Sequence, residues 1–474
     1  MDRWASDKAR PPGLDLLVID DLDLTIRSLG ECRHDSPLAE LLYLRPSSNH
    51  WVDAEDRVLL DDTAALAAAR GVTVDELPGF EAGGPRRRIF FDPSKTRVGI
   101  VTCGGLCPGL NNVIRGLVME LWRHYGVRRI IGFRNGYQGF VARYAHPVVE
   151  LTPDVVRNIN EDGGTILGSS RGQQDPEEIV DCLEQLGVNI LFVIGGDGSL
   201  VGAQRIADVI AERRLRVAVV GVPKTIDNDI PFIDHSFGFR TAFSRATESI
   251  RAAHIEARSA PGGVGLVKLM GRHSGFIACY AALAKNDADI VLIPEVPFRV
   301  EAVVEHVRAK VAEQGHAVLV VAEGAGQEHV EGVGTDASGN ARFGDITRLL
   351  QARIADAFAA RDEELNLKQL DPSYVIRSVP ANPYDSVYCV RLAHAAVHAG
   401  MAGRTELVVG RFHGRFVHIP IRVATSRRST VDPAGDLWLS VLESTGQPAH
   451  WRGSKAVEDE GRNGFGLALD LERR

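Results

Sequence analysis

Short apolar runs recur along the chain, and each one ends in a loop of glycines and polar residues. The runs at 190–194 and 217–222 have the length and the β-branched composition of buried parallel strands. Amphipathic segments with helical spacing, such as 200–213 and 300–312, lie between runs of this kind. Further strands are predicted at 98–102, 264–270, 289–293 and 316–321. This alternation predicts an α/β fold of two doubly wound, Rossmann-like lobes with parallel-rich sheets.

A longer amphipathic helix is predicted in the middle of the chain. Its apolar side chains recur at steps of three and four: Phe239, Phe243, Ala246, Ile250, Ala253 and Ala257. Charged residues lie off this stripe, which is typical of a helix that packs one face on a sheet. We expect this helix to begin the second lobe, with its aromatic residues in the core. Another helix is predicted at 385–401.

The loop after the first of the two central strands contains three glycines and an aspartate. Gly195, Gly196 and Gly198 allow the backbone to approach a ligand and to take positive φ. Ser199 is a suitable N-cap for the helix that follows, and the start of a helix attracts anions. The Asp197 carboxylate is favourable at an anion site only if a cation lies between it and the bound anion. A magnesium ion on a polyphosphate meets that condition. The alternative is a tight strand-to-helix turn with an aspartate cap.

The loop after the second central strand supplies a base and a cation. Asp227 and Asp229 are two residues apart, so in an extended loop they face the same side, near Lys224. Two close carboxylates raise each other's pKa values, and a lysine lowers them. An ionised aspartate beside a substrate hydroxyl is a workable general base. The alternative is an Asx-turn that carries surface charges.

These two loops resemble those of the phosphofructokinase family, whose members phosphorylate fructose 6-phosphate at C1. Further motifs follow in family order, beginning at Thr102, Gly163, Leu266, Ile293 and Asp371. The resemblance extends over about residues 90–421. It is closest to the longer ATP-dependent type of plants and trypanosomes, which has a similar N-terminal extension. The resemblance implies that ATP is the phosphoryl donor and that Mg2+ is required.

The resemblance assigns roles to particular residues. It implies that Asp227 is the catalytic base, that Lys224 offsets charge on the transferring phosphoryl group, and that Asp197 holds magnesium. Residues implied in ATP binding are Gly105, Arg171, Gly172, Gly196, Asp197, Gly198 and Ser199. Residues implied in substrate binding are Thr225, Asp227, Asp229, Met270, Gly271, Arg272, Glu323, Lys368, Tyr374 and Arg377. From the sequence alone, Arg171 is equally consistent with a surface arginine, and Glu323 with a turn residue.

Two positions depart from relatives in informative ways. Where this chain has Gly263, the short bacterial enzymes carry an arginine that reaches a neighbouring active site. Lys224 is the natural replacement for that positive charge. The pyrophosphate-using branch usually carries aspartate where this chain has Gly198. An aspartate there would repel the α-phosphate of a nucleotide, whereas glycine leaves room for it. The sequence therefore favours ATP over pyrophosphate as the donor.

The 474 residues are enough for two or three domains. We expect an N-terminal extension at 1–94, an ATP-binding lobe at 95–237 and a fructose 6-phosphate lobe at 238–374. Residues 375–474 should return to the first lobe and end in a polar tail. An Ala-rich helix is predicted at 63–70. The Gly-Gly-Pro-Arg-Arg-Arg run at 83–88 is interpreted as a solvated linker, with an effector site at Arg86 to Arg88 as the less favoured alternative.

Composition limits the possible partners. A formal net charge of −8 argues against non-specific binding to nucleic acid or to an anionic membrane. The charged N-terminus lacks an apolar signal core, and no apolar run is long enough to span a membrane. The six cysteines lack zinc spacing and indicate buried thiols in a reducing cytoplasm. His394 and His398 share a helix face without a third ligand, so a metal site is not expected there.

Other functions remain open from the sequence alone. A non-catalytic regulatory subunit of the same fold would be expected to lose the base or the metal residue, but Asp197, Asp227 and Asp229 are all present. Lipid and NAD kinases share a Gly-Gly-Asp-Gly turn but lack the loop at 223–229. The resemblance also implies a homo-oligomer, either a tetramer or a dimer, without deciding between them.

Overall fold

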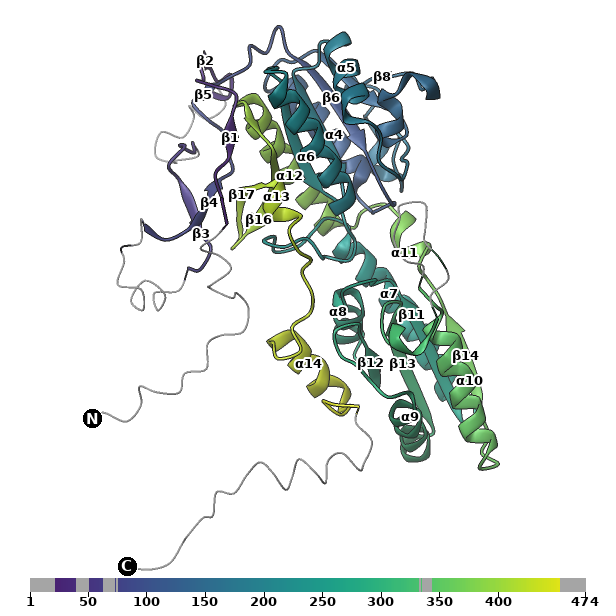
Figure 1. Cartoon of the computed structure of the whole chain (residues 1–474). Helices are drawn as coiled ribbons and strands as arrows, with labels where there is room; N and C mark the ends of the chain where they lie inside the picture. The colour runs from purple at the N-terminus through teal and green to yellow at the C-terminus, as the bar shows by residue number, and fades with distance from the viewer. Residues whose placement is uncertain are drawn as a thin grey trace, which may run out of the picture. The chain divides into compact units, whose positions relative to one another are not determined.

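The computed structural model describes residues 22–39, 51–62, 73, 76–331, 334 and 343–451. The chain divides into two compact units (Figure 1). The first unit contains the chain up to Arg245 together with Tyr374–Ser429, and the second contains Ala246–Gly334, Ala341–Ser373 and the segment from Thr430. Both units are layered α/β structures, so the α/β fold predicted from the sequence is confirmed.

A nine-stranded mixed sheet forms the centre of the first unit. Its order is β3-β4-β17-β16-β10-β9-β6-β7-β8, and the run from β16 to β7 is parallel. The parallel strands are β6 Arg97–Thr102, β7 Arg129–Phe133, β9 Ile190–Gly195, β10 Ala218–Pro223 and β16 Leu407–Phe412. The remaining strands are β3 Arg57–Leu59, β4 Gly79–Ala82, β8 Val149–Glu150 and β17 Arg415–Pro420. β9 and β10 are direct neighbours, so their carboxyl-terminal loops lie side by side.

Helices cover both faces of this sheet, as the alternation along β9 shows. Leu191 and Val193 belong to a core cluster with residues of α5 Pro176–Gln185 and α6 Asp197–Glu212. On the other face, Gly400 of α12 Pro383–Met401 approaches Ile190 and Phe192. α12 also packs on α4 Leu110–Arg123. Because successive strand residues point to opposite faces, the sheet is doubly wound.

The described part of the N-terminal extension contributes strands to the first unit. β4 pairs with β17, and β3 pairs with β4, both antiparallel. Two small ladders also form: β1 Arg27–Ser28 with β15 Arg404–Thr405, and β2 His34–Asp35 with β5 Arg88–Ile89. The helix predicted at 63–70 lies outside the described residues.

The prediction of a solvated linker at 83–88 is wrong, because Arg86, the first arginine of this run, is buried. Arg86 is 8% exposed, and its Nη2 donates to Glu81 Oε1 at 2.8 Å. Arg404 and His418 contact the same carboxylate oxygen, at 3.0 and 2.9 Å. A run of glycine, proline and arginine looks like a solvated linker in a single sequence, because the buried acid that pairs with Arg86 does not show in that run.

The second unit contains a four-stranded parallel sheet of order β12-β13-β11-β14. Its strands are β11 Gly263–Leu269, β12 Ile290–Leu292, β13 His316–Ala322 and β14 Asn366–Leu370. Its helices are α8 Phe276–Lys285, α9 Val300–Gln314, α10 Ile346–Ala359 and α14 Asp436–Thr445. After α14, Gln447 accepts from the Val291 amide at 2.6 Å and donates to the Val291 carbonyl at 3.2 Å. The Gln447 side chain therefore pairs with the edge strand of this sheet.

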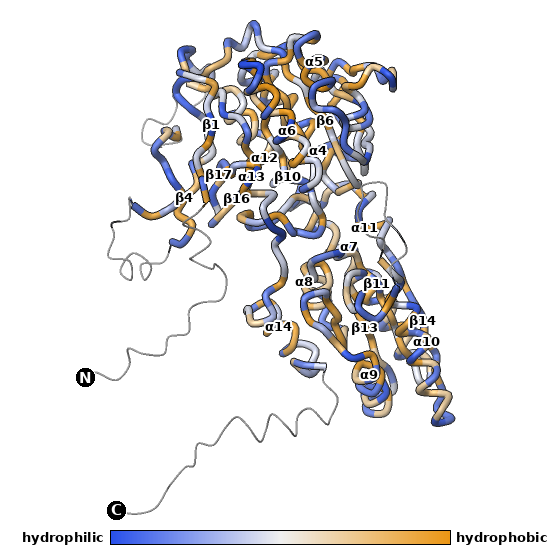
Figure 2. Tube along the Cα trace, in the orientation of Figure 1, coloured by the Kyte–Doolittle hydropathy of each residue, from blue (hydrophilic) through white to orange (hydrophobic). Residues whose placement is uncertain are grey.

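The helix predicted in the middle of the chain is α7 Phe239–Arg258, and the unit boundary after Arg245 falls within it. Phe239, Ala246, Ile250, Ala253 and Ala257 are buried, as predicted, whereas Phe243 is only half-buried. Hydrophobic and hydrophilic residues alternate along the helices in Figure 2, as expected for helices with one face on a sheet. None of the helices among the described residues is long and apolar enough to cross a membrane.

Candidate active site

The glycine turn after β9 is tighter than the sequence predicted. α6 begins at Asp197 with Gly196 as its N-cap, so Ser199 lies inside the helix and the N-cap assigned to Ser199 is wrong. Gly195, Gly196 and Gly198 do not take positive φ. Gly195 is required for another reason, since a Cβ there would collide with the Ser199 side chain. The turn brings the amino end of α6 directly to the end of the strand, where anions are attracted.

Gly198 lies in the first turn of α6 with open space beside it. A Cβ built at Gly198 meets no heavy atom within 4 Å, and its φ is not positive. Gln173 Nε2 donates to the Gly198 carbonyl at 2.9 Å, so the loop with Arg171 and Gly172 meets this turn. Neither packing nor backbone conformation requires glycine at 198. A ligand requirement is the remaining physical reason for a bare backbone at this place.

A buried lysine joins the second central loop to a second glycine loop. Lys224, which follows β10, is 7% exposed, and its Nζ donates to the Gly105 carbonyl at 2.8 Å. Gly104 has φ +83°, and a Cβ there would lie 3.2 Å from that Nζ. Burial lowers the pKa of Lys224, while nearby acidic groups that include Asp197 and Asp227 act to raise it. The bond to the Gly105 carbonyl thus holds the ammonium group beside the loops after β6, β9 and β10.

The loop that carries the two aspartates is internally hydrogen-bonded. Thr225 Oγ1 donates to Asp229 Oδ1 at 2.8 Å and accepts from the Asp227 amide at 3.1 Å. Asn228 takes φ +58°, and its Oδ1 accepts from the Ser236 amide at 2.8 Å. The loop is therefore a bonded turn, as the alternative interpretation held, but Asp229 is not a surface charge: its side chain is 12% exposed. Burial and the charge of Asp197 raise the pKa of Asp229.

An arginine that the sequence analysis did not single out completes this cluster. Arg428 donates to Asp197 Oδ2 from Nη2 at 2.7 Å and from Nε at 3.0 Å. The same Nε lies 4.0 Å from Asp229 Oδ2. Arg428 belongs to the polar stretch after residue 426, where the family motifs have ended. The only signal in the sequence is the pair of adjacent arginines at 427 and 428.

The residues around Asp197 fit a magnesium ion carried by a polyphosphate. A cation, the Arg428 guanidinium, already lies between the carboxylates of Asp197 and Asp229. Within the described ranges, no group of three or more His, Cys, Asp or Glu side chains could hold a metal ion by itself. Magnesium that binds one or two carboxylates and completes its shell with phosphate oxygens and water needs no larger group.

In the second unit, two strand-end loops bring an arginine and a glutamate together. Gly271 has φ +131°, and its carbonyl accepts from the Gly324 amide at 3.0 Å. A side chain at Gly324 would collide with the Arg272 carbonyl, so the backbones of the two loops are in contact. The Arg272 guanidinium lies 4.6 Å from the centre of the Phe343 ring. Arg272 and Glu323 therefore lie at the carboxyl ends of neighbouring parallel strands, where ligands bind in sheets of this kind.

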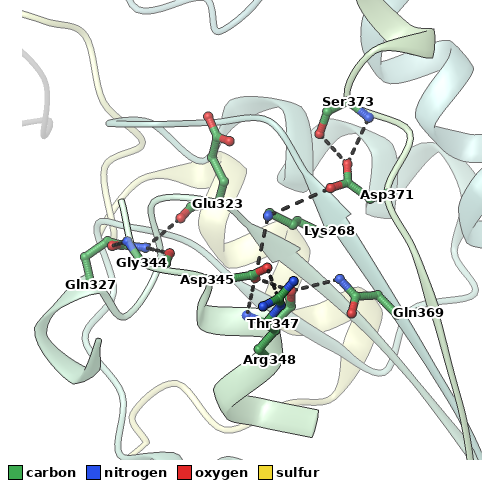
Figure 3. A network of polar contacts seen from close by, with 10 residues as sticks. All are labelled: Lys268, Glu323, Gln327, Gly344, Asp345, Thr347, Arg348, Gln369, Asp371 and Ser373. Carbon is green, nitrogen blue, oxygen red and sulfur yellow. Dashed lines mark hydrogen bonds and ion pairs between the residues drawn. The ribbon is translucent and has the colours of Figure 1, made fainter. Parts of the chain in front are cut away.

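A polar network continues beside Glu323 (Figure 3). Lys268 Nζ lies 3.5 Å from Asp345 Oδ1 and 3.8 Å from Asp371 Oδ2. Gln327 Nε2 donates to the Glu323 carbonyl at 2.8 Å and to the Gly344 carbonyl at 3.1 Å. Figure 3 shows the Glu323 carboxylate pointing away from Gln327. The hydrogen bond from Gln327 therefore holds the backbone of Glu323 and does not involve its carboxylate.

The remaining predicted residues are placed individually. Met270 follows β11 and is half-buried, whereas Lys368 is exposed in the middle of β14, opposite Gly265. Tyr374 is 76% exposed, and the Arg377 guanidinium lies 4.7 Å from its ring centre. Both belong to the first unit: Tyr374 is the N-cap of α11 Val375–Ser378, and Arg377 lies within this short helix. The structure thus pairs Tyr374 with Arg377 but places Lys368 on a strand face rather than at a strand end.

Comparison with known proteins shows the family. The profile of the family described as Phosphofructokinase matches residues 97–400. The chain belongs to the phosphofructokinase family. It is 56% identical over 454 residues to the ATP-dependent 6-phosphofructokinase of Amycolatopsis methanolica, covering 94% of this chain and 98% of that relative. Membership of this family removes the lipid and NAD kinase alternatives.

Plant and trypanosome members of the phosphofructokinase family are also similar. ATP-dependent 6-phosphofructokinase 7 of Arabidopsis thaliana is 47% identical over 87% of this chain and 84% of that relative. The ATP-dependent 6-phosphofructokinase of Trypanosoma cruzi is 44% identical over 85% of each chain. These matches confirm the resemblance to the longer ATP-dependent type.

Solved structures show the same fold. The pyrophosphate-dependent phosphofructokinase of Marinobacter aquaeolei has a TM-score of 0.63 at 21% identity, covering 74% of this chain and 91% of that chain. At this identity the likeness concerns the fold and carries no information on the phosphoryl donor. The donor has to be argued from the residues at the glycine turn.

Proposed function

We propose that this chain is an ATP-dependent 6-phosphofructokinase that transfers the γ-phosphoryl group of ATP to the C1 hydroxyl of fructose 6-phosphate in glycolysis. One observation supports it above the others. The loops after the neighbouring strands β9 and β10 carry the anion-binding end of α6 and the Asp227 loop, and Lys224 bridges to a second glycine loop. A carboxylate loop, a buried cation and the amino end of a helix thus lie at one edge of a parallel sheet, and this grouping supports the proposal.

Each residue of this group has a proposed role. Asp227 accepts the proton of the C1 hydroxyl as that oxygen attacks the γ-phosphorus. The Lys224 ammonium and the amino end of α6 offset the negative charge on the phosphoryl oxygens. Asp197 would hold magnesium, which would neutralise negative charge on the phosphates of the donor. Gly105, Arg171, Gly172 and Ser199 would contact the nucleotide.

Sugar-phosphate binding is assigned to the remaining predicted residues. Thr225 and Asp229 would bind the sugar next to Asp227, and Thr225 also fixes the loop through both aspartates. Met270, Gly271, Arg272 and Glu323 are proposed to recognise the hexose from the strand ends of the second unit. Lys368, Tyr374 and Arg377 are proposed to bind its 6-phosphate. The Tyr374 side chain is 76% exposed, so it is accessible to a ligand.

The proposed donor is ATP. Gly198 provides open space beside the phosphate cradle that neither packing nor backbone conformation explains, and a nucleotide needs that space for its α-phosphate. The similar relatives from Amycolatopsis, Arabidopsis and Trypanosoma are all named as ATP-dependent enzymes. Pyrophosphate-dependent transfer is the second candidate, supported by Lys224, which that branch shares.

A donor comparison tests this proposal. Purified protein would be assayed with fructose 6-phosphate, Mg2+ and either ATP or pyrophosphate, and the bisphosphate product would be measured. We expect turnover with ATP at least tenfold above that with pyrophosphate, and loss of activity when Mg2+ is chelated. Turnover with pyrophosphate and none with ATP would refute the ATP assignment, and no turnover with either would refute the enzyme.

The remaining proposals concern the state of the protein in the cell. We propose a cytoplasmic homo-oligomer, a dimer or a tetramer, that binds neither nucleic acid nor membranes. Light scattering of the purified protein would give its mass against the 51.5 kDa of one chain. A monomer at micromolar concentration would contradict this assignment.

A further inference from the structure

Arg428 occupies an unusual place for a residue outside the predicted site. Its guanidinium contacts the carboxylate oxygens Asp197 Oδ2 and Asp229 Oδ2, which come from two different loops. The side chains of Arg428 and Asp197 are 37% and 39% exposed, whereas that of Asp229 is 12% exposed. The contact is therefore open to solvent on the Asp197 side, and a dissolved ion can reach it.

The backbone next to Arg428 is also attached to this site. The Ser429 amide donates to the Asp229 carbonyl at 2.8 Å, and Ser426 bonds back to Val423 at the end of α13 Ile421–Ala424. We call residues 426–429 the strap. The strap thus contacts the aspartates through the Arg428 side chain and through one backbone bond, and the chain enters the second unit at Thr430, directly after it.

A metal ion and Arg428 would compete for the same oxygens. A divalent cation on Asp197 would take the Oδ2 atom that now accepts both Arg428 hydrogen bonds. Two cations a few ångströms apart repel each other, so the guanidinium and the ion would not share this position. Without a cation between them, the carboxylates of Asp197 and Asp229 would repel each other, even with the Lys224 ammonium group nearby.

We propose that Arg428 is a built-in counter-cation of the Asp197–Asp229 pair, which holds the two carboxylates before the metal-bearing nucleotide binds and leaves them when it does. The strap then loses its side-chain contact and its backbone bond to the Asp227 loop loosens. This inference rests on the proposed function, because it takes Asp197 as the metal-binding residue. It adds Arg428 to the site. It also links the binding of the metal-bearing nucleotide to the strap, a backbone segment outside the site.

The neighbouring arginine provides a matched control. The Arg427 guanidinium lies 5.3 Å from the centre of the Phe232 ring, and its ring contact is separate from the Asp197 and Asp229 contacts of Arg428. Arg427→Gln and Arg428→Gln remove the same charge from adjacent positions. Both arginines are exposed, so neither substitution is expected to prevent folding, which circular dichroism would check.

The test measures metal binding, not turnover. Mn2+ would replace Mg2+, and its binding would be followed by electron paramagnetic resonance with the non-hydrolysable ATP analogue AMP-PNP. We expect Arg428→Gln to bind Mn2+ about three- to fivefold more tightly than the wild type, the upper part of the range expected for removing one partly exposed competing charge. Arg427→Gln should stay within about twofold of the wild type, as expected for a charge outside the contact.

Hydrogen exchange gives a second readout on the strap. In the wild type, adding Mn2+ with AMP-PNP should increase exchange in the peptide that contains Ser429. Unchanged or weaker Mn2+ binding in Arg428→Gln, or unchanged exchange in that peptide, would overturn the inference. Asp197→Asn separates the two proposals: if the wild type binds no Mn2+ with AMP-PNP, or binds it independently of Asp197, the metal site itself fails. If binding depends on Asp197 but not on Arg428, only the role of Arg428 fails.

Discussion

Gly198 is the residue whose identity has the most direct chemical consequence. It sits in the first turn of α6 with helical backbone and open space where a side chain would be. Glycine in a helix costs about 1 kcal/mol relative to alanine, so without a ligand the position would favour another residue. A phosphate that must lie against the backbone is a physical reason to retain that cost.

Gly198→Asp tests whether a phosphate lies there. The substituted chain should fold, since a Cβ at 198 meets nothing within 4 Å. Its carboxylate would repel the α-phosphate of ATP, so kcat/KM for ATP should fall about 10–100-fold, and that for pyrophosphate much less. Steady-state kinetics with both donors would measure the change.

Gly198→Ala is the control for the glycine position. A methyl group adds no charge and meets no protein atom, but it takes part of the space left for the α-phosphate, so this variant should lose clearly less ATP activity than Gly198→Asp. Equal losses for alanine and aspartate would mean that bulk alone, and not charge, excludes the nucleotide. Equal losses for ATP and pyrophosphate in Gly198→Asp would remove the residue from donor choice.

At the scale of secondary structure elements, α4 and α12 form a tight pair on one face of the main sheet. A Cβ on Gly116 of α4 would lie 2.7 Å from that of Ala393 on α12, so the two helices approach closely. His398, farther along α12, is half-buried, and its Nδ1 is 2.8 Å from the hydroxyl of the buried Tyr125. Burial lowers the pKa of His398 to about 3.

This histidine should make the protein less stable in acid. The unfolded chain binds a proton at His398 near pH 6.5, while the folded protein does not until about pH 3. Stability is therefore unaffected above pH 6.5 and falls between pH 6.5 and 3, by up to about 1.4 kcal/mol per pH unit. Urea unfolding at pH 7 and pH 5 should give a steeper loss for the wild type than for His398→Gln.

An exposed histidine serves as the comparison for His398. His450→Gln, at a surface position, should retain the full loss between pH 7 and 5. If His398→Gln also retained it, the acid sensitivity would arise elsewhere, for example at buried His235, whose pKa burial lowers to about 4.

The sequence predicted the elements better than their ends. Strands such as β9 and β10 were found because a short β-branched run between polar segments is typical of a buried strand. The sequence predicts too late a start for α6, because Ser199 is the stronger cap by residue type. The close packing of Gly195 against Ser199 is a contact of the folded chain, which the sequence does not show. Asp227 and Lys224 could be found from residue type and spacing, whereas Arg428 could not, because it approaches Asp197 only in the folded chain.

At the scale of the whole molecule, residues before the family match are built into the first unit. Glu81 on β4 is 4% exposed and accepts from Arg86, Arg404 and His418, so it ties the N-terminal strands to β17 and to the segment before β16. The sequence treated residues 1–94 as an extension that stands apart, because partners more than 300 residues away leave no local pattern.

Glu81→Ala should destabilise the protein strongly. It leaves the buried Arg86 and the largely buried Arg404 without their shared carboxylate, and removing one partner of a buried ion pair costs about 3–5 kcal/mol. Denaturant unfolding would measure the loss. Glu31→Ala, whose side chain is 74% exposed, should cost less than about 1 kcal/mol. Similar costs for the two variants would show that the cluster does not hold the N-terminal strands.

Asp227 is the residue on which the proposed reaction depends. Asn fills the same space but cannot accept a proton, so Asp227→Asn should bind nucleotide normally and fail in transfer. The most direct measurement is the single-turnover rate of phosphoryl transfer from ATP to fructose 6-phosphate, with nucleotide affinity determined in parallel. The account predicts a rate about 10²–10⁴-fold below the wild type at unchanged affinity. A rate within about tenfold of the wild type would contradict the assignment of Asp227 as the base.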